Sequence, residues 1–189
     1  MDEKGLLYFK DHSEWREWLH GNHANYKGIN LIFYKVDHEN ESMRWEEAVK
    51  VALCYGWIDS TVKSLGKGKR QQYFCQRKPK GTWSKVNKAH IKELIENGLM
   101  HESGLAKINA AKKDGSWTAL DDVENGIIPN DLKIAFDKNP KAYENYNCFT
   151  NGQQKSYLYW LKQAKRDDTR QKRISEIISR CAANEKSRQ

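Results

Sequence analysis

Asp59 is the last acidic residue before residues 60–92, a segment that contains ten basic residues and no acid. A carboxylate at this place can pair with an arginine of the segment, such as Arg77, and thereby order the turn that precedes it. It can instead orient a hydrogen-bond donor of a ligand beside the ring of Trp57. The sequence leaves both roles open, and the pairing with Arg77 is the first expectation.

The positive charge of the chain is concentrated in residues 60–92. The 189 residues carry a net charge of +8, yet residues 1–59 have seven basic residues against eleven acidic ones, and residues 93–189 have sixteen against fourteen. A basic segment with interleaved aromatic residues can follow a phosphate backbone and stack on bases. It can equally hold an anionic metabolite or a lipid headgroup. A solvated hairpin that merely displays surface lysines also stays open.

Two further groups of side chains are candidates for binding an anion. Arg77, Lys78, Lys85 and Lys88 could form an anion site, with Trp83 as a further candidate beside them, because Ser84 is a natural N-cap whose helix would present free N–H groups to an anion. Arg170 and Arg173 are three residues apart and share one face of the last predicted helix. This pair could clamp a carboxylate or phosphate, or it could dock the last helix on acids of the N-terminal half.

No arrangement of residues indicates catalysis. Cys54 has no histidine near it in sequence, no serine has a nucleophile-elbow context, and "GKGK" at 66–69 lacks the spacing of a phosphate-binding loop. The six histidines are scattered without the spacing of a zinc site. We therefore predict no catalytic residue, no metal and no cofactor, and we regard an enzymatic activity as uncertain and disfavoured.

The composition is that of a globular protein, with 38% hydrophobic and 31% charged residues. No apolar run approaches the length of a membrane span. The N-terminus "MDEKGLLYFKDHSEW" has acids where an export signal requires cations, so the expected location is the cytoplasm. The four cysteines form no paired motif.

The N-terminal part is predicted to combine two helices with a small sheet. One helix spans 11–23 and the other spans 43–56, with Trp45 and Ala48 opening its apolar stripe. Residues 28–36 form a strand, and 57–77 form a hairpin around "GKGK". These strands predict a small antiparallel sheet that carries helices.

From Ser84 onward the pattern is helical, with helices predicted over 84–98, 102–115, 130–140, 141–149, 150–167 and 168–189, the last with a tail that is expected to fray. The predicted fold class is therefore α+β, mostly α: a small antiparallel sheet with packed helices, followed by a C-terminal helical region. We place the seam between residues 1–83 and 84–189 and expect the two regions to form one compact unit.

Several motifs in order resemble those of a known family. "EEAVKVALCYGWIDS", "RQQYFCQRKPKGTWSKVNKAHIKELIENGLMHESG", "AKKDGSW", "IPNDL" and "AKRDDTRQKRI" are similar to the bacterial YdeI/OmpD-associated family, the bacteriocin-protection proteins, from about residue 10 to 181. The resemblance implies an association with envelope stress, cationic peptides and bacteriocins. It implies no catalytic residues. Cys75 and Gln76 stand where the family tends to have a hydroxyl residue and a proline, and "GKGK" is more basic than the family pattern.

Together these observations predict a stress-linked protective protein that acts by binding an anionic ligand or a protein partner. One alternative is a nucleic-acid-binding protein that uses residues 60–92. The other is an enzyme for a small anionic substrate, which would require Trp57, Asp59, Arg77 and Trp83 to converge on one closed pocket.

Overall fold

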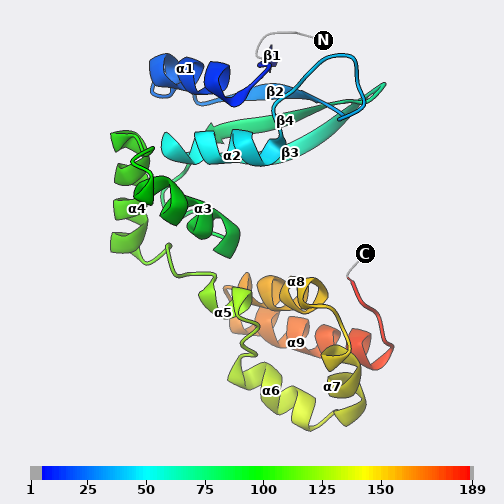
Figure 1. The fold of residues 1–189 in the computed structure, drawn as a ribbon. Coiled ribbons are helices and arrows are strands. Elements are labelled where there is room, and N and C mark those ends of the chain that lie inside the picture. Colours follow the sequence, from blue (N-terminus) through cyan, green and yellow to red (C-terminus); the bar gives the residue numbers. More distant parts are fainter. Residues whose placement is uncertain (1–5, 188–189) are drawn as a thin grey trace. The chain divides into compact units, whose positions relative to one another are not determined.

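The computed structural model describes residues 6–187 and confirms an α+β fold that is mostly helical (Figure 1). The described chain consists of two compact units, the first ending at Thr118 and the second beginning at Ala119. This division differs from the expected seam at 83/84, because the two helices that follow residue 84 pack on a helix of the sheet-bearing part.

The first unit contains a four-stranded sheet with the strand order β1-β2-β4-β3. Its strands are β1 (Leu6–Tyr8), β2 (Gly28–Tyr34), β3 (Trp57–Gly66) and β4 (Lys69–Gln76). The pairs β2–β4 and β3–β4 are antiparallel, as predicted, but β1 runs parallel to β2. The sheet is therefore mixed. A strand of three residues is too short to show the alternating pattern by which strands are predicted.

Four helices complete the first unit: α1 (His12–Asn22), α2 (Trp45–Cys54), α3 (Lys85–Glu96) and α4 (Glu102–Asp114). Side-chain caps start two of them where the sequence predicts. Asp11 Oδ1 accepts hydrogen bonds from the backbone N–H groups of Ser13 and Glu14 at 2.8 and 3.0 Å. Ser84 Oγ accepts from the N–H of Asn87 at 3.2 Å. Each cap satisfies helix N–H groups that have no partner within the helix.

The core of the first unit is rich in aromatic residues. Trp15 from α1 lies edge-on to Phe74 of β4 and to Trp57 of β3, and all three rings are fully buried. The indole N–H of Trp57 donates to the carbonyl of His23 at 3.1 Å, so its one polar group is satisfied. Burial of a ring such as Phe74 contributes on the order of 1.5–3 kcal/mol.

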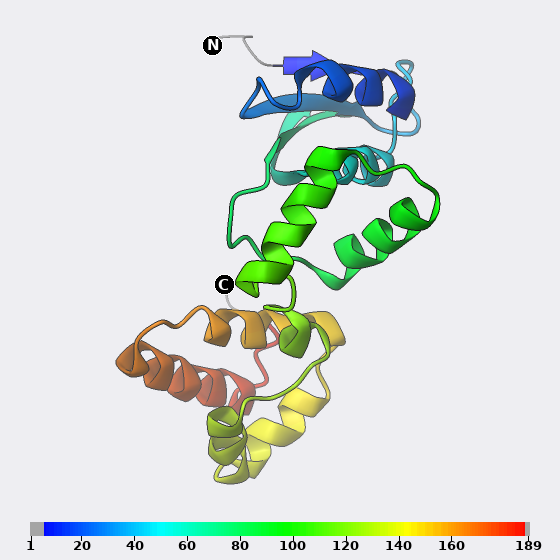
Figure 2. The ribbon, with the colours of Figure 1, turned by 90° about the vertical axis from the view of Figure 1, so that its left-hand side faces the viewer.

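A close approach of backbones joins α4 to the end of α2 (Figure 2). The N–H of His101 donates to the carbonyl of Cys54 at 3.1 Å, and Ser103 Oγ donates to the carbonyl of Tyr55 at 3.1 Å. A Cβ atom at Gly104 would lie 2.2 Å from the Cys54 carbonyl oxygen, far inside contact distance. Glycine at this place is therefore what lets α4 reach α2.

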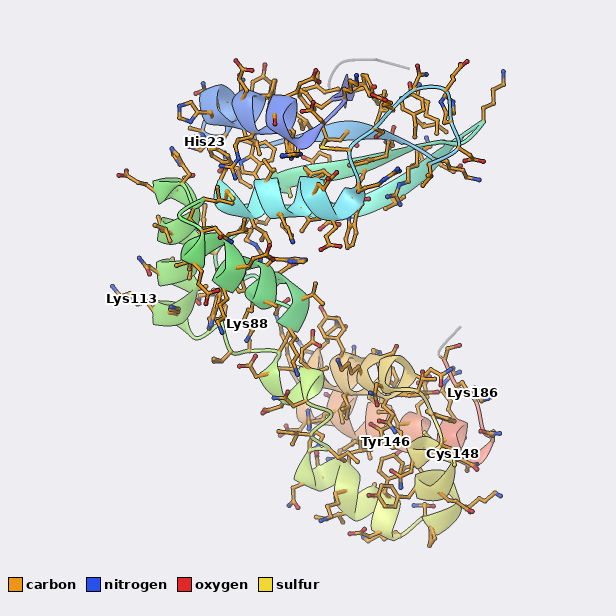
Figure 3. All side chains as sticks on the ribbon, in the orientation of Figure 1. His23, Lys88, Lys113, Tyr146, Cys148 and Lys186 are labelled. Carbon is orange, nitrogen blue, oxygen red and sulfur yellow. The ribbon has the colours of Figure 1, made fainter. Side chains whose placement is uncertain are left out.

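The second unit is helical, and its core is separate from that of the first unit. Its helices are α5 (Asp121–Glu124), α6 (Asn130–Asp137), α7 (Pro140–Asn147), α8 (Asn151–Lys162) and α9 (Asp167–Ala182). Tyr146, labelled in Figure 3, packs its ring against Phe136 with centroids 4.9 Å apart. Its buried hydroxyl has no hydrogen-bond partner in the described part of the chain, and burial raises the pKa of this group.

Replacement of Gly104 by alanine tests the α2–α4 approach. We expect Gly104→Ala to lower the free energy of unfolding by about 1–3 kcal/mol, because the new methyl group would overlap backbone that cannot move aside cheaply. Urea unfolding followed by circular dichroism measures the change. Gly21→Ala in α1 is the matched control, since no heavy atom lies within 4 Å of its added Cβ. Equal stability of both variants would refute the close approach.

Candidate functional site

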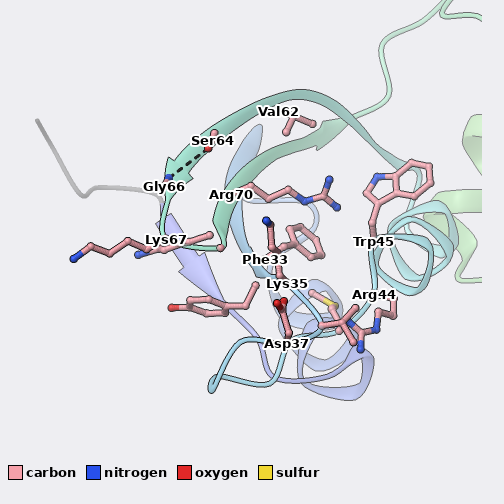
Figure 4. A pocket seen from close by; sticks show the side chains of 15 residues that line it. Phe33, Lys35, Asp37, Arg44, Trp45, Val62, Ser64, Gly66, Lys67 and Arg70 are labelled. Carbon is pink, nitrogen blue, oxygen red and sulfur yellow. Dashed lines mark hydrogen bonds between the residues drawn. The ribbon is translucent and has the colours of Figure 1, made fainter.

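The main candidate site is a pocket of about 810 Å³ in the first unit, at the end of the sheet where the tip of the β3–β4 hairpin lies (Figure 4). We call it the hairpin-tip pocket. It is bounded by the end of β2 with the loop after it, by the start of α2 and by the turn between β3 and β4. In Figure 1 these three segments gather at one end of the unit. The volume is in the range of small-molecule sites in proteins.

Cationic side chains dominate the lining of the hairpin-tip pocket. Five are present, against the single acid Asp37: Lys35, Arg44, Lys67, Lys69 and Arg70. In the part of the chain that the structure describes, none of the five forms a salt bridge. No direct ion pair within the described residues therefore neutralises these cations, and Asp37 is the one carboxylate that lines the pocket with them.

Two aromatic side chains, Phe33 and Trp45, form an apolar wall beside these cations. Phe33 is buried beneath the pocket, and the guanidinium of Arg70 lies over its ring at 5.4 Å. The two residues are direct partners across the β2–β4 ladder, which places Arg70 on the ring. Trp45 stands at the other side with 43% of its surface exposed, and Figure 4 shows the Arg70 side chain pointing toward that side.

Asp59 is not among the residues that line the pocket, but it is bonded to Trp45, which is. Its Oδ2 accepts a hydrogen bond from Trp45 Nε1–H at 3.0 Å and another from Gln72 Nε2–H at 2.6 Å. Gln72 is only 3% exposed, and its own Oε1 has no hydrogen-bond partner among residues 6–187. A bulge in β3 directly after Asp59 shifts the register of the hairpin at this point. One carboxylate therefore links β3, β4 and α2.

The expected pairing of Asp59 with Arg77 is absent from the described structure. Arg77 is 6% exposed and stacks on Trp83, with its guanidinium carbon 3.5 Å from the ring centre, and its Nη1 donates to the carbonyl of Thr82 at 3.1 Å. Burial lowers the pKa of Arg77 to about 10, and the negative charge of Asp59 partly opposes this shift. Asp59 thus acts on Arg77 through space, while its hydrogen bonds go to Trp45 and Gln72.

The other sequence candidates of the first unit do not line the hairpin-tip pocket. Trp57 is fully buried in the core, and Trp83 packs on Trp117 with ring centres 5.1 Å apart. Lys85 is the first residue of α3 and is exposed. The convergence of Trp57, Asp59, Arg77 and Trp83 that the enzyme hypothesis requires is not found at this pocket.

Arg170 and Arg173 dock α9 within the second unit. Arg170 makes a two-pronged ion pair with Asp131 of α6, with Nε–Oδ2 and Nη2–Oδ1 distances of 2.5 and 2.9 Å. This arginine lowers the pKa of Asp131. Arg173 donates to the carbonyl of Trp160 and lies over its ring at 5.0 Å. The docking partner of Arg170 is therefore an acid of the same C-terminal unit, not one of the N-terminal half as expected.

Sequence reasoning missed most of the pocket. Lys67 and Lys69 could have been identified from the sequence, because they make the "GKGK" turn more basic than the family pattern. Trp45 was expected in the core stripe of its helix, but it is the first residue of α2, where the helix begins beside the pocket. Lys35 and Arg44 lie outside residues 60–92, and nothing in their local sequence distinguishes them.

A second polar cluster lies at the junction of α1, α2 and α4. The ring of His101 is 4.8 Å from that of His23, which is labelled in Figure 3, and 5.9 Å from that of His20. It also stacks on Tyr55 at 4.9 Å. His101 is the N-cap of α4, because its Nδ1 accepts from the N–H of Ser103 at 3.2 Å. This bond requires the neutral ring.

Neither a metal centre nor a membrane span is visible in residues 6–187. No three histidine, cysteine, aspartate or glutamate side chains there are placed to hold a metal ion. No helix among these residues combines the length and apolar character needed to cross a membrane.

Comparison with known proteins divides the chain into two matched regions. Residues 7–107, more than half of the chain, match a family model described as a domain of unknown function (DUF8412). Residues 125–184 match the OmdA model, described as "Bacteriocin-protection, YdeI or OmpD-Associated". The predicted resemblance to that family is thereby confirmed for part of the chain. No curated protein and no solved structure matches the chain.

Loss of the Asp59 carboxylate is expected to release Trp45. Asp59→Ala would leave the buried Gln72 amide without its acceptor, so we expect a loss of about 1–3 kcal/mol in the free energy of unfolding. The indole N–H signal of Trp45, assigned with Trp45→Phe, should shift toward that of a solvated indole in a ¹H–¹⁵N spectrum. Ser60→Ala, one residue along in the exposed bulge, serves as the control. An unchanged indole signal in Asp59→Ala would contradict this role.

Acid is expected to weaken the junction around His101. Burial, followed by the charges of His23 and His20, lowers the pKa of His101, while Glu102 acts in the opposite direction. Because the unfolded chain then binds the proton more readily, the stability contribution is complete above pH ~6.5 and is lost as the pH falls below that value. His101→Asn keeps a capping side chain but does not titrate.

The measurement is the midpoint of urea unfolding at pH 7.5 and pH 5.5 for the wild-type protein, His101→Asn and His12→Gln. The drop in midpoint on acidification should be smaller in His101→Asn than in the wild-type protein. His12→Gln, outside the cluster, should keep the wild-type drop. An identical drop in all three proteins would remove His101 as its cause.

Proposed function

We propose that this chain, which belongs to the family described as a domain of unknown function (DUF8412), is a protective protein that acts by binding an anionic small molecule in the hairpin-tip pocket. The description of the OmdA family that residues 125–184 match supports the protective part of this proposal. A stress-linked role in the cytoplasm is part of the same proposal.

The observation that carries the binding part is the unpaired charge of the pocket. Five cations and one acid line a concave site with an apolar wall, and no salt bridge of the described chain neutralises the cations. The side chain of one of the five, Lys67, points away from the pocket in Figure 4. Charges of one sign in a concave site raise the local concentration of oppositely charged ligands. A bound anion would relieve the repulsion among the cations and so stabilise the protein.

The same charge constrains how protection would work. Peptides that carry positive charge are repelled from the hairpin-tip pocket, because like charges brought together across an interface cost several kcal/mol. Direct capture of a cationic peptide at this site is therefore disfavoured. In our proposal the protein protects by binding an anionic ligand in the pocket, and it does not bind the cationic peptide there.

Nucleic-acid binding remains the second candidate, because Lys67, Lys69 and Arg70 of the pocket come from the basic residues 60–92. The two candidates differ in extent. A nucleic acid would contact cations along the whole hairpin, including Lys63, which is exposed and does not line the pocket. A small anion would depend on the lining cations alone.

Titration calorimetry with inorganic triphosphate tests the proposal. We expect binding that weakens with salt, and a loss of affinity of about tenfold or more in Arg70→Gln, since a hydrogen bond to a charged group is worth about 1.5–3 kcal/mol. Lys63→Gln is the matched control on the same hairpin and should bind as the wild-type protein does.

Equal losses in both variants, together with tight binding of single-stranded DNA or RNA, would favour the nucleic-acid candidate. Absence of triphosphate binding at low salt would refute the pocket as an anion site. The protective part is tested separately, by complementing a deletion strain with the wild-type and Arg70→Gln genes and measuring survival under bacteriocin. Equal survival of the two strains would show that protection does not depend on anion binding by Arg70 in the pocket.

A further inference from the structure

We infer that the ligand of the hairpin-tip pocket combines a planar aromatic ring with a phosphate group, as a nucleoside phosphate does. This inference rests on the proposed anion-binding function and adds a ring-binding wall to it. The wall is formed by Trp45, and the phosphate position is formed by the cations that face it.

Trp45 has the properties of a stacking platform. It lines the pocket at the first position of α2, and 43% of its surface is exposed, unlike the buried Trp15 and Trp57 of the same unit. Its only polar group, the indole N–H, is already bonded to Asp59. What the side chain offers a ligand is therefore the apolar face of its ring, on which any flat ring can stack.

The orientation of this ring is set before a ligand arrives. Asp59 Oδ2 accepts from Trp45 and from the buried Gln72 at once, so the carboxylate is held from β4 while it holds the indole from α2. A ring that is already oriented loses less conformational entropy on binding, which raises the affinity of a stacking partner.

Arg70 supplies a phosphate-binding group at the correct side of the pocket. Its guanidinium carbon lies 5.4 Å from the centre of the Phe33 ring, and its planar group carries a fork of N–H donors. Such a fork matches the geometry of phosphate oxygens. Figure 4 shows Arg70 pointing across the pocket toward the Trp45 side. A ring on Trp45 and a phosphate near Arg70 can thus belong to one molecule.

The hairpin turn brings a second cation to the same place. Gly66, Lys67 and Gly68 all have positive φ angles, of 76°, 47° and 69°. The turn folds back so that the N–H of Lys35 donates to the carbonyl of Gly68 at 2.9 Å, which joins the loop after β2 to the hairpin. Lys35 thereby lines the pocket, whereas the side chain of Lys67 points away from it in Figure 4.

Simpler ligands would use only half of the pocket. An inorganic anion would leave the exposed faces of Trp45 and Val62 in water, although both line the pocket. A neutral aromatic compound would leave the unpaired cations without a counter-charge. The combination of ring and phosphate satisfies both parts, and a volume of about 810 Å³ accommodates a ligand of that size.

The test compares four nucleoside monophosphates (AMP, GMP, CMP and UMP) with ribose 5-phosphate, which lacks the ring, and with adenosine, which lacks the phosphate. Titration calorimetry at fixed ionic strength should show at least one monophosphate binding tenfold or more tightly than either partial compound. Trp45→Ala should weaken that monophosphate about tenfold and leave ribose 5-phosphate unchanged. Arg70→Gln should weaken both, while Lys63→Gln should weaken neither.

Two failures are distinguishable in this design. If ribose 5-phosphate binds as tightly as every monophosphate and all depend on Arg70, the ring inference is overturned and the anion site stands. If no monophosphate binds while inorganic triphosphate does, the ring inference is likewise overturned and the anion site stands. If none of these compounds and no inorganic triphosphate binds, the anion site itself is refuted. Circular dichroism spectra and melting temperatures show whether Trp45→Ala is folded, and Trp45→Phe, which keeps a flat ring, should retain most of the monophosphate affinity.

The source of the nucleotide is resolved by one further titration, with decamers of single-stranded DNA and RNA. A decamer that binds more tightly than the monophosphate, and loses that affinity in both Trp45→Ala and Arg70→Gln, would assign the same ring and phosphate sites to a strand. Weaker binding of the decamers than of the monophosphate would assign them to a free nucleotide.

Discussion

The carboxylate of Asp59 is the interaction on which the candidate site depends. It sits at a bulge of β3 and accepts hydrogen bonds from Gln72 on β4 and from Trp45 on α2, two residues that are distant from each other in sequence. Because one charged acceptor serves two donors, the start of α2 cannot move away from the hairpin without breaking a charge-assisted bond. The pocket exists because α2 begins at this place and the hairpin continues beyond it.

Arg77, which is buried in the first unit, stabilises the segment between β4 and α3 and does not line the pocket. Arg77 stacks on Trp83 and donates to Thr82, so it closes the segment between β4 and α3 on itself. One of its buried nitrogens, Nε, has no hydrogen-bond partner among the residues that the structure describes, and burial lowers the pKa of the Arg77 guanidinium. A charge in this condition is retained at a cost in stability, which the stacking on Trp83 offsets in part. The positive charge that faces solvent in the pocket comes from other residues.

The candidate pocket and the match to the bacteriocin-protection family model lie in different units of the chain. The first unit contains the pocket and matches a family whose function is not described, whereas the match that names bacteriocin protection falls on residues 125–184. The second unit uses Arg170 and Arg173 for internal docking, so the candidate anion site and the family description lie in different parts of the chain.

Local sequence was sufficient to determine the helix caps at Asp11 and Ser84, the antiparallel hairpin with its basic turn, the α+β class and the family of residues 125–184. Each depends on neighbours within a few residues or on an ordered set of motifs. The partner of Asp59, the exposure of Trp45 and the arrival of Lys35 and Arg44 beside Arg70 were decided only in the tertiary structure. They depend on strand register, on a bulge and on where a helix begins relative to a hairpin. These are long-range relations, and the period of a single segment does not encode them.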